Sequence, residues 1–88
     1  MGEVAVLFRL MPKSVESDLQ SIAKGVKDAL PPGTRIRGIQ AKDIAYGLRA
    51  LLVSVVMADS GGVLPSIEEA FAKIPDVESV EVMEESLL

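Results

Sequence analysis

The side chains that most often carry out catalysis are missing from this sequence. It contains no histidine and no cysteine, so it lacks the usual general base near neutral pH, thiol nucleophiles and thiolate metal ligands. Two pairs of acids are adjacent in the chain, Glu68 with Glu69 and Glu84 with Glu85. Neighbouring residues point apart on a helix and to opposite faces of a strand, so neither pair forms an acid–base dyad. We therefore expect no bond-making chemistry, no metal site and no cofactor.

A short glycine-containing loop offers a second kind of chemistry, anion binding. Asp59-Ser60-Gly61-Gly62 precedes an expected helix, and the first turn of a helix can hold a phosphate through its backbone N–H groups. The segment lacks the Gly-Lys-Ser/Thr sequence of a phosphate-binding loop. An ordinary turn is therefore the favoured interpretation.

One aromatic residue stands out by its position. Tyr46 is the only tyrosine, and with Gly47 it forms a turn-like pair just before the most continuous apolar run of the chain, residues 51–56. A run that is apolar on both faces predicts a strand in the middle of a sheet. Two interpretations of the ring stay open. It folds back onto the sheet, or it projects from the loop as an anchor for a partner, as hot-spot aromatics do.

The composition indicates one small globular domain spanning residues 1–88. Hydrophobic residues make up 49% of the chain, but only three residues are aromatic, so the core must be aliphatic. The start of the sequence is acidic, without the positive flank and apolar stretch of a signal peptide. No apolar stretch approaches the roughly 20 residues that span a bilayer. We expect a soluble, cytoplasmic protein without membrane contact.

Charge is distributed unevenly along the chain. Residues 24–49 carry a net charge of +4, whereas the residues from Asp59 onward carry −7. A net charge of −4 for the whole chain disfavours direct nucleic-acid binding, because a phosphate footprint needs a basic surface. A local basic patch and a plain solvated surface both remain open for the positive segment.

The spacing of apolar residues predicts six elements. We expect strands at 3–11, 34–44, from the Tyr46–Gly47 turn to about 58, and 77–83, with helices at 14–30 and 65–74. Ser14 or Ser17 is the expected cap of the first helix, and Gly25 predicts a close approach of that helix to the sheet. Gly38 is the expected site of a bulge. Residues 84–88 show no clear period.

Each of the two expected helices should bury one stripe of apolar side chains. Their members are Val15, Leu19, Ile22, Val26, Ala29 and Leu30 in the first, and Leu64, Ile67, Phe71 and Ile74 in the second. Glu68 and Glu69 are expected near the start of the second helix, where acids are favoured by its dipole.

The order strand, helix, strand, strand, helix, strand predicts an α+β, ferredoxin-like sandwich. Its four-stranded antiparallel sheet would place the first and third strands in the centre and both helices on one face. The opposite face would be less well covered. We expect it to carry Arg9, Arg35 or Arg37, Arg49, and some of Leu51, Val53 and Val55, and to be a candidate docking surface.

Several segments together resemble the archaeal elongation factor 1-beta family, the nucleotide-exchange factors of translation elongation factor 1-alpha. The resemblance covers essentially the whole chain and is most specific at Ile44-Ala45-Tyr46-Gly47-Leu48-Arg49-Ala50-Leu51. The other matching segments follow in the same order and spacing: Arg9-Leu10-Met11-Pro12, Leu30-Pro31-Pro32-Gly33-Thr34, Asp59-Ser60-Gly61-Gly62 and Val77-Glu78-Ser79-Val80-Glu81-Val82.

The resemblance implies the same fold and a role in exchanging GDP for GTP on elongation factor 1-alpha, without hydrolysis and without a cofactor. In eukaryotic relatives an aromatic in the segment that matches Tyr46 packs into the nucleotide-binding domain of the partner. Their C-terminal end approaches the partner's Mg²⁺ and phosphates. The implied partner-binding residues of this chain are Ile44, Ala45, Tyr46, Gly47, Leu48 and Arg49.

One departure from the family concerns the C-terminal end. The eukaryotic relatives place a lysine there, at the Mg²⁺ site, whereas residues 84–88 of this chain contain no base. We therefore assign no Mg²⁺-displacing residue. An alternative function of another class is a small-molecule-binding regulatory module of the same fold, which would dimerise through its sheet. Tyr46 and its flanks have no role in that alternative.

Overall fold

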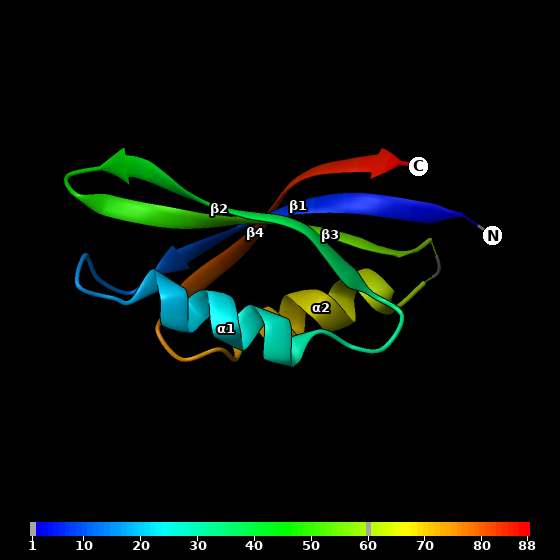
Figure 1. Ribbon diagram of the computed structural model, residues 1–88, viewed down its shortest axis with the longest axis horizontal. Helices are drawn as coiled ribbons and strands as arrows, with labels where there is room; N and C mark the ends of the chain where they lie inside the picture. The colour runs from blue at the N-terminus through cyan, green and yellow to red at the C-terminus, as the bar shows by residue number, and fades with distance from the viewer. Residues whose placement is uncertain (1, 60) are drawn as a thin grey trace.

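A computed structural model describes residues 2–59 and 61–88 of the chain. Its elements are β1 (Glu3–Pro12), α1 (Leu19–Ala29), β2 (Arg35–Ala45), β3 (Leu48–Ala58), α2 (Val63–Ala72) and β4 (Val77–Leu87). The strands form one antiparallel sheet in the order β2-β3-β1-β4, and both helices cover the same face of it (Figure 1). The predicted ferredoxin-like sandwich is confirmed.

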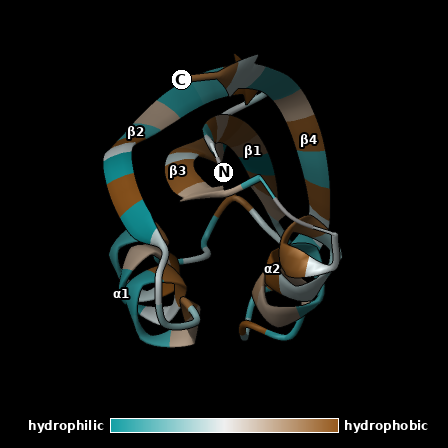
Figure 2. Cartoon of the chain, turned by 90° about the vertical axis from the view of Figure 1, so that its right-hand side faces the viewer, coloured by the Kyte–Doolittle hydropathy of each residue, from teal (hydrophilic) through white to brown (hydrophobic). Residues whose placement is uncertain are grey.

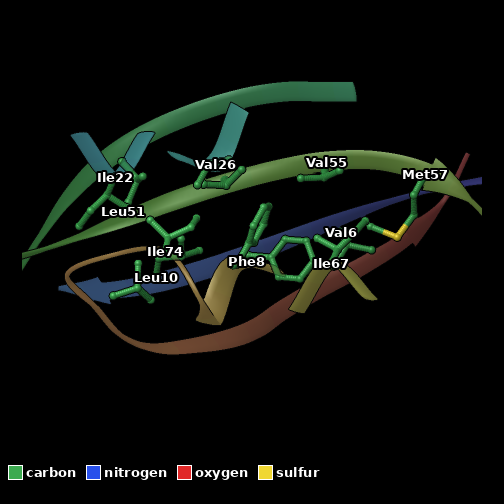
Figure 3. Close-up of a cluster of buried hydrophobic side chains, with 13 residues drawn as sticks. Val6, Phe8, Leu10, Ile22, Val26, Leu51, Val55, Met57, Ile67 and Ile74 are labelled. Carbon is green, nitrogen blue, oxygen red and sulfur yellow. The ribbon is translucent and has the colours of Figure 1, made fainter. Parts of the chain in front are cut away.

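The core lies between the sheet and the helices. The central strands β1 and β3 supply most of it because their sequences are apolar on both faces, and Phe8 is paired with Val53 across them. Phe8 meets Phe71 of α2 edge to face, with ring centroids 5.1 Å apart. Aliphatic side chains surround this aromatic pair (Figure 3). The expected aliphatic core is therefore confirmed, with one aromatic contact at its centre.

The first helix begins five residues later than predicted. Its N-cap is Asp18, whose carboxylate accepts a hydrogen bond of 3.0 Å from the N–H of Gln20. Ser14 and Ser17 do not cap the helix, because their hydroxyls accept hydrogen bonds from loop N–H groups instead. Val15 is thus outside the helix and 61% exposed, so its place in the buried stripe was wrong. Such local serine bonds compete with helix formation, which is why the helix starts late.

Gly25 does mark a close approach, but not the predicted one to the sheet. A methyl group added at this position would lie 2.8 Å from Cγ2 of Ile74, in the segment that follows α2. Ile74 is buried in the core cluster. The glycine therefore lets α1 pack against the end of α2, and the expected contact with the sheet was the wrong partner.

The bulge in β2 is confirmed, whereas the expected composition of the open sheet face is partly wrong. The β2–β3 pairing shifts between Ile36 and Gly38. Leu51, Val53 and Val55 are all buried against the helices, so the alternate positions of β3 take the open face. Arg9 and Arg35 pair with two of those alternate positions and lie on the open face as predicted.

The end of the chain is more regular than its sequence indicates. β4 runs to Leu87, which pairs with Val4 of β1, and the N–H of Leu88 donates to the carbonyl of Glu3 at 2.9 Å. The predicted end of the last strand, at residue 83, was therefore too early. The period was hidden by a register shift between Leu7 and Phe8, since a bulge moves later side chains to the other face.

The second helix, in contrast, begins earlier than predicted, at Val63. Glu68 and Glu69 consequently lie beyond its first turn, where the dipole no longer favours them. Glu69 instead forms an ion pair with Lys73 at 3.4 Å, one turn further along. Of the Asp59–Gly62 loop, Ser60 lies outside the described residues.

The domain is elongated, with principal extents of 42 × 20 × 17 Å. The turn between β2 and β3 projects at one end, and both chain termini lie near the opposite end (Figure 1). Viewed along the long axis, the sheet curls over the two helices (Figure 2). None of the helices in the described part of the chain is long and apolar enough to cross a membrane.

Candidate partner-binding site

The turn that joins β2 to β3 places Tyr46 and Gly47 in the left-handed backbone region. Their φ angles are 53° and 80°, and Ala45 pairs with Leu48 on either side of them. Two consecutive residues with positive φ define the type I′ turn, which matches the twist of a hairpin. Glycine adopts this conformation freely, but tyrosine does so only at a cost. The local backbone therefore does not explain why a tyrosine occupies the position.

The ring of Tyr46 is fully exposed. Its relative accessibility is 102%, the largest of any large hydrophobic residue among those described. The interpretation in which the ring folds back onto the sheet is therefore wrong. A large aromatic ring exposed to water at the tip of a β-hairpin makes no contribution to the core, and it is available to a partner.

Arg49 is held near the tip by a cross-strand ion pair. Its Nε lies 3.3 Å from the carboxylate of Asp43, the residue opposite it in the register. The expectation that Arg49 lies on the open sheet face is wrong. It borders a hollow together with Leu19 and Gln20 from the start of α1, on the same side of the sheet as the helices. The alternation with Leu51 along β3 sets this direction.

The remaining predicted residues complete the same hairpin. Ile44 is the extra residue at a register shift between Asp43 and Ala45, and it is 40% exposed. The bulge turns its side chain out of the regular alternation, which exposes an isoleucine beside the tip. All six predicted positions thus lie in one hairpin end, as their contiguity in sequence requires.

The structure adds exposed apolar residues that the sequence did not single out. Val15 lies in the loop after β1 and borders the same hollow as Arg49. Met83, Leu87 and Leu88, in β4 and at the end of the chain, are also exposed, and the C-terminal end lies far from the hairpin tip (Figure 1). Val15 was missed because its spacing fits a buried helical stripe. The others were missed because the bulge in β4 hides their period.

The charged side chains of the sheet form structural ion pairs. Arg35 binds both carboxylate oxygens of Glu3 at 3.0 and 3.2 Å, and this hydrogen bonding, with the charge of the guanidinium, lowers the pKa of the Glu3 carboxyl. Arg9 donates to Glu81 at 2.6 Å. Within residues 2–59 and 61–88, no three acidic side chains come together as a metal site would require. The Arg9–Glu81 pair links the neighbouring strands β1 and β4, whereas the Arg35–Glu3 pair reaches across β3 to join β2 to β1.

One exposed ring at the tip of a β-hairpin, with no convergent catalytic groups among the described residues, is typical of a protein-binding domain. Comparison with known families makes the class more specific: the EF-1 guanine nucleotide exchange domain matches residues 5–88. The chain belongs to the elongation factor 1-beta family, and its role is therefore one of guanine nucleotide exchange in translation elongation.

Relatives from archaea support this assignment over nearly the whole chain. The chain is 43% identical to elongation factor 1-beta of Haloarcula marismortui over 82 residues, which cover 93% of each chain. It is 41% identical to elongation factor 1-beta of Methanosarcina mazei over 85 residues, which cover 96% of each. The expected family resemblance is confirmed.

Solved structures with low sequence identity show the same fold. The C-terminal domain of the MgtC protein from Mycobacterium tuberculosis superposes with a TM-score of 0.70 at 14% identity, over 93% of this chain and 87% of that one. The ACT domain from GTP pyrophosphokinase of Chlorobium tepidum superposes with a TM-score of 0.65 at 13% identity, over 92% of this chain and 99% of that one. These likenesses concern the fold alone, since one fold hosts many functions.

Proposed function

We propose that this domain speeds the release of GDP from elongation factor 1-alpha by binding the nucleotide-free GTPase more tightly than its GDP complex. The observation that supports this most directly is the fully exposed ring of Tyr46 at the tip of a β-hairpin, in a chain of the exchange-factor family. The GTPase would bury this ring as an anchor. Ile44, Ala45, Gly47, Leu48 and Arg49 would hold the ring in place or border the contact.

Exchange of this kind requires binding energy and no covalent step. If the domain weakens the affinity of the GTPase for GDP by some factor, then GDP weakens the affinity for the domain by the same factor. GTP can then enter the emptied site and displace the domain. This is consistent with a chain that carries no histidine and no cysteine.

The elongated shape bears on how the partner is contacted. Tyr46 at the hairpin tip and the exposed Leu87 and Leu88 at the end of the chain lie at opposite ends of a domain 42 Å long (Figure 1). A GTPase that touched both groups would do so with two well-separated surfaces. The residues of the C-terminal end contain no base, so we assign to them contact but no displacement of Mg²⁺.

The test is release of fluorescently labelled GDP from elongation factor 1-alpha, followed after addition of excess unlabelled nucleotide. We expect the rate to rise with the concentration of the domain and then to reach a plateau. If a saturating concentration of the domain leaves the release rate at its intrinsic value, the proposed function is wrong.

Reversing the charge of Arg49 should slow association. Arg49→Glu places a carboxylate opposite Asp43, whose carboxylate lies 3.3 Å from the guanidinium of the natural residue, and it removes a cation from a segment of net charge +4. Because rim charges act mainly on the association rate, we expect that rate to fall by about tenfold at low salt with less change in dissociation. Stopped-flow association measured across a salt series checks this. An association rate that does not respond to salt in the wild-type domain contradicts the electrostatic role.

A further inference from the structure

We infer that a groove between α1 and the β2–β3 hairpin is a second contact for the GTPase, and that it receives an apolar side chain flanked by a carboxylate. This inference rests on the proposed function and identifies a surface that the exposed ring alone does not. The groove is bordered by Leu19, Gln20, Ala23, Ile39, Ala41, Arg49 and Leu51.

The groove is apolar along its length. Leu19 and Ala23 form one wall on α1, and Ile39, Ala41 and Leu51 form the floor on the sheet. Its volume is about 300 Å³, at the lower limit of small-molecule pockets, which run from about 300 to 1,000 Å³. A surface depression of this size suits one or two protein side chains better than a cofactor.

The groove leads to the exposed apolar residues at the hairpin end. A neighbouring hollow shares Leu19, Gln20 and Arg49 with it and extends to Val15 in the loop after β1. Val15, Ile44 and Tyr46 are all exposed at this end of the domain. The groove and the ring therefore lie at the same end of the domain, so a partner that buries Tyr46 can also reach the mouth of the groove.

The charge at the mouth sets the chemistry of the occupant. The Arg49 side chain is 56% exposed and forms an ion pair with the carboxylate of Asp43, whose side chain is 91% exposed. A guanidinium has five N–H donors, so it can bind a second carboxylate without losing the first. The positive charge of residues 24–49 further favours an acidic partner surface. An apolar residue next to an aspartate or glutamate of the GTPase fits both features.

The inference is tested by filling the groove from both walls. Ala41→Phe adds a ring from the sheet and Gln20→Phe adds one from α1. Both positions are exposed, so the fold should survive, and thermal melting checks that it does. The matched controls are Gln40→Phe, which points to the opposite sheet face beside Leu52, and Ser21→Phe, the exposed neighbour on α1. Each control adds the same ring and leaves the net charge unchanged.

The readout is the concentration of domain that gives half-maximal acceleration of labelled GDP release. We expect both groove variants to raise it about tenfold or more, as loss of a buried contact does, and both controls to match the wild type. If the wild type accelerates release but a groove variant behaves like its control, the inference is wrong while the proposed function stands. If sedimentation instead shows a dimer that Ala41→Phe abolishes, the groove belongs to a second copy and the inference is also wrong.

Discussion

Replacing Tyr46 by alanine is expected to raise the concentration of domain needed for half-maximal GDP release by about thirtyfold. The ring is fully exposed in the free domain, so its whole surface is available for burial by the partner. Loss of a desolvated aromatic anchor costs about 2 kcal/mol or more of binding free energy, which is about thirtyfold in affinity. The effect should lie in binding, since the ring contributes nothing to the core.

The measurement is a titration of labelled GDP release with the wild type, Tyr46→Ala and Tyr46→Phe. The phenylalanine variant keeps the ring and should stay within a few-fold of the wild type, because the anchor role belongs to the apolar ring. Melting temperatures of all three should be close. If Tyr46→Ala exchanges nucleotide as well as the wild type, the ring is not an anchor.

The second large effect concerns stability. Phe71→Ala should lower the free energy of unfolding by about 3 to 5 kcal/mol, the usual cost of removing a buried phenylalanine ring. Phe71 is fully buried and meets Phe8 edge to face at 5.1 Å. A domain of 88 residues has a total stability of about 4 to 13 kcal/mol. The substitution should therefore remove a large part of it.

Urea denaturation followed by circular dichroism gives this free energy. Tyr46→Ala is the matched control, because it removes an aromatic ring of similar size from an exposed position and should leave the midpoint nearly unchanged. A shift of less than about 1 kcal/mol for Phe71→Ala would show that the two-ring contact is not central to the core.

The layer architecture was predictable because the strongest signals in the sequence are periodic and local. The continuous apolar runs around Phe8 and Val53 indicate central strands, and the helices between them follow from their spacing. The start of α1 was not predictable in the same way. Three possible caps lie within five residues, at Ser14, Ser17 and Asp18, and only the loop contacts of the serines decide between them.

The position of the candidate site in the chain was predictable, but the directions of the Tyr46 and Arg49 side chains were not. Tyr46-Gly47 between two strands indicates a hairpin turn, yet the exposure of the ring depends on how far the hairpin extends past α1. The side on which Arg49 lies depends on the alternation along β3, which is read correctly only after Leu51 is placed in the core. The exposure of Leu87 and Leu88 at the C-terminal end was hidden by the bulge at Met83, since a single extra residue reverses every later side chain.

The left-handed backbone at Tyr46 is unfavourable for a tyrosine, and this conformational cost bears on both natural selection and protein engineering. Asparagine fits a left-handed hairpin position better than any aromatic residue does, so a library sorted for heat resistance alone would become enriched in the Tyr46→Asn substitution and discard the ring. Sorting by capture on the GTPase would hold the tyrosine in place. The two selections should therefore diverge at this one codon while agreeing across the buried face of the sheet.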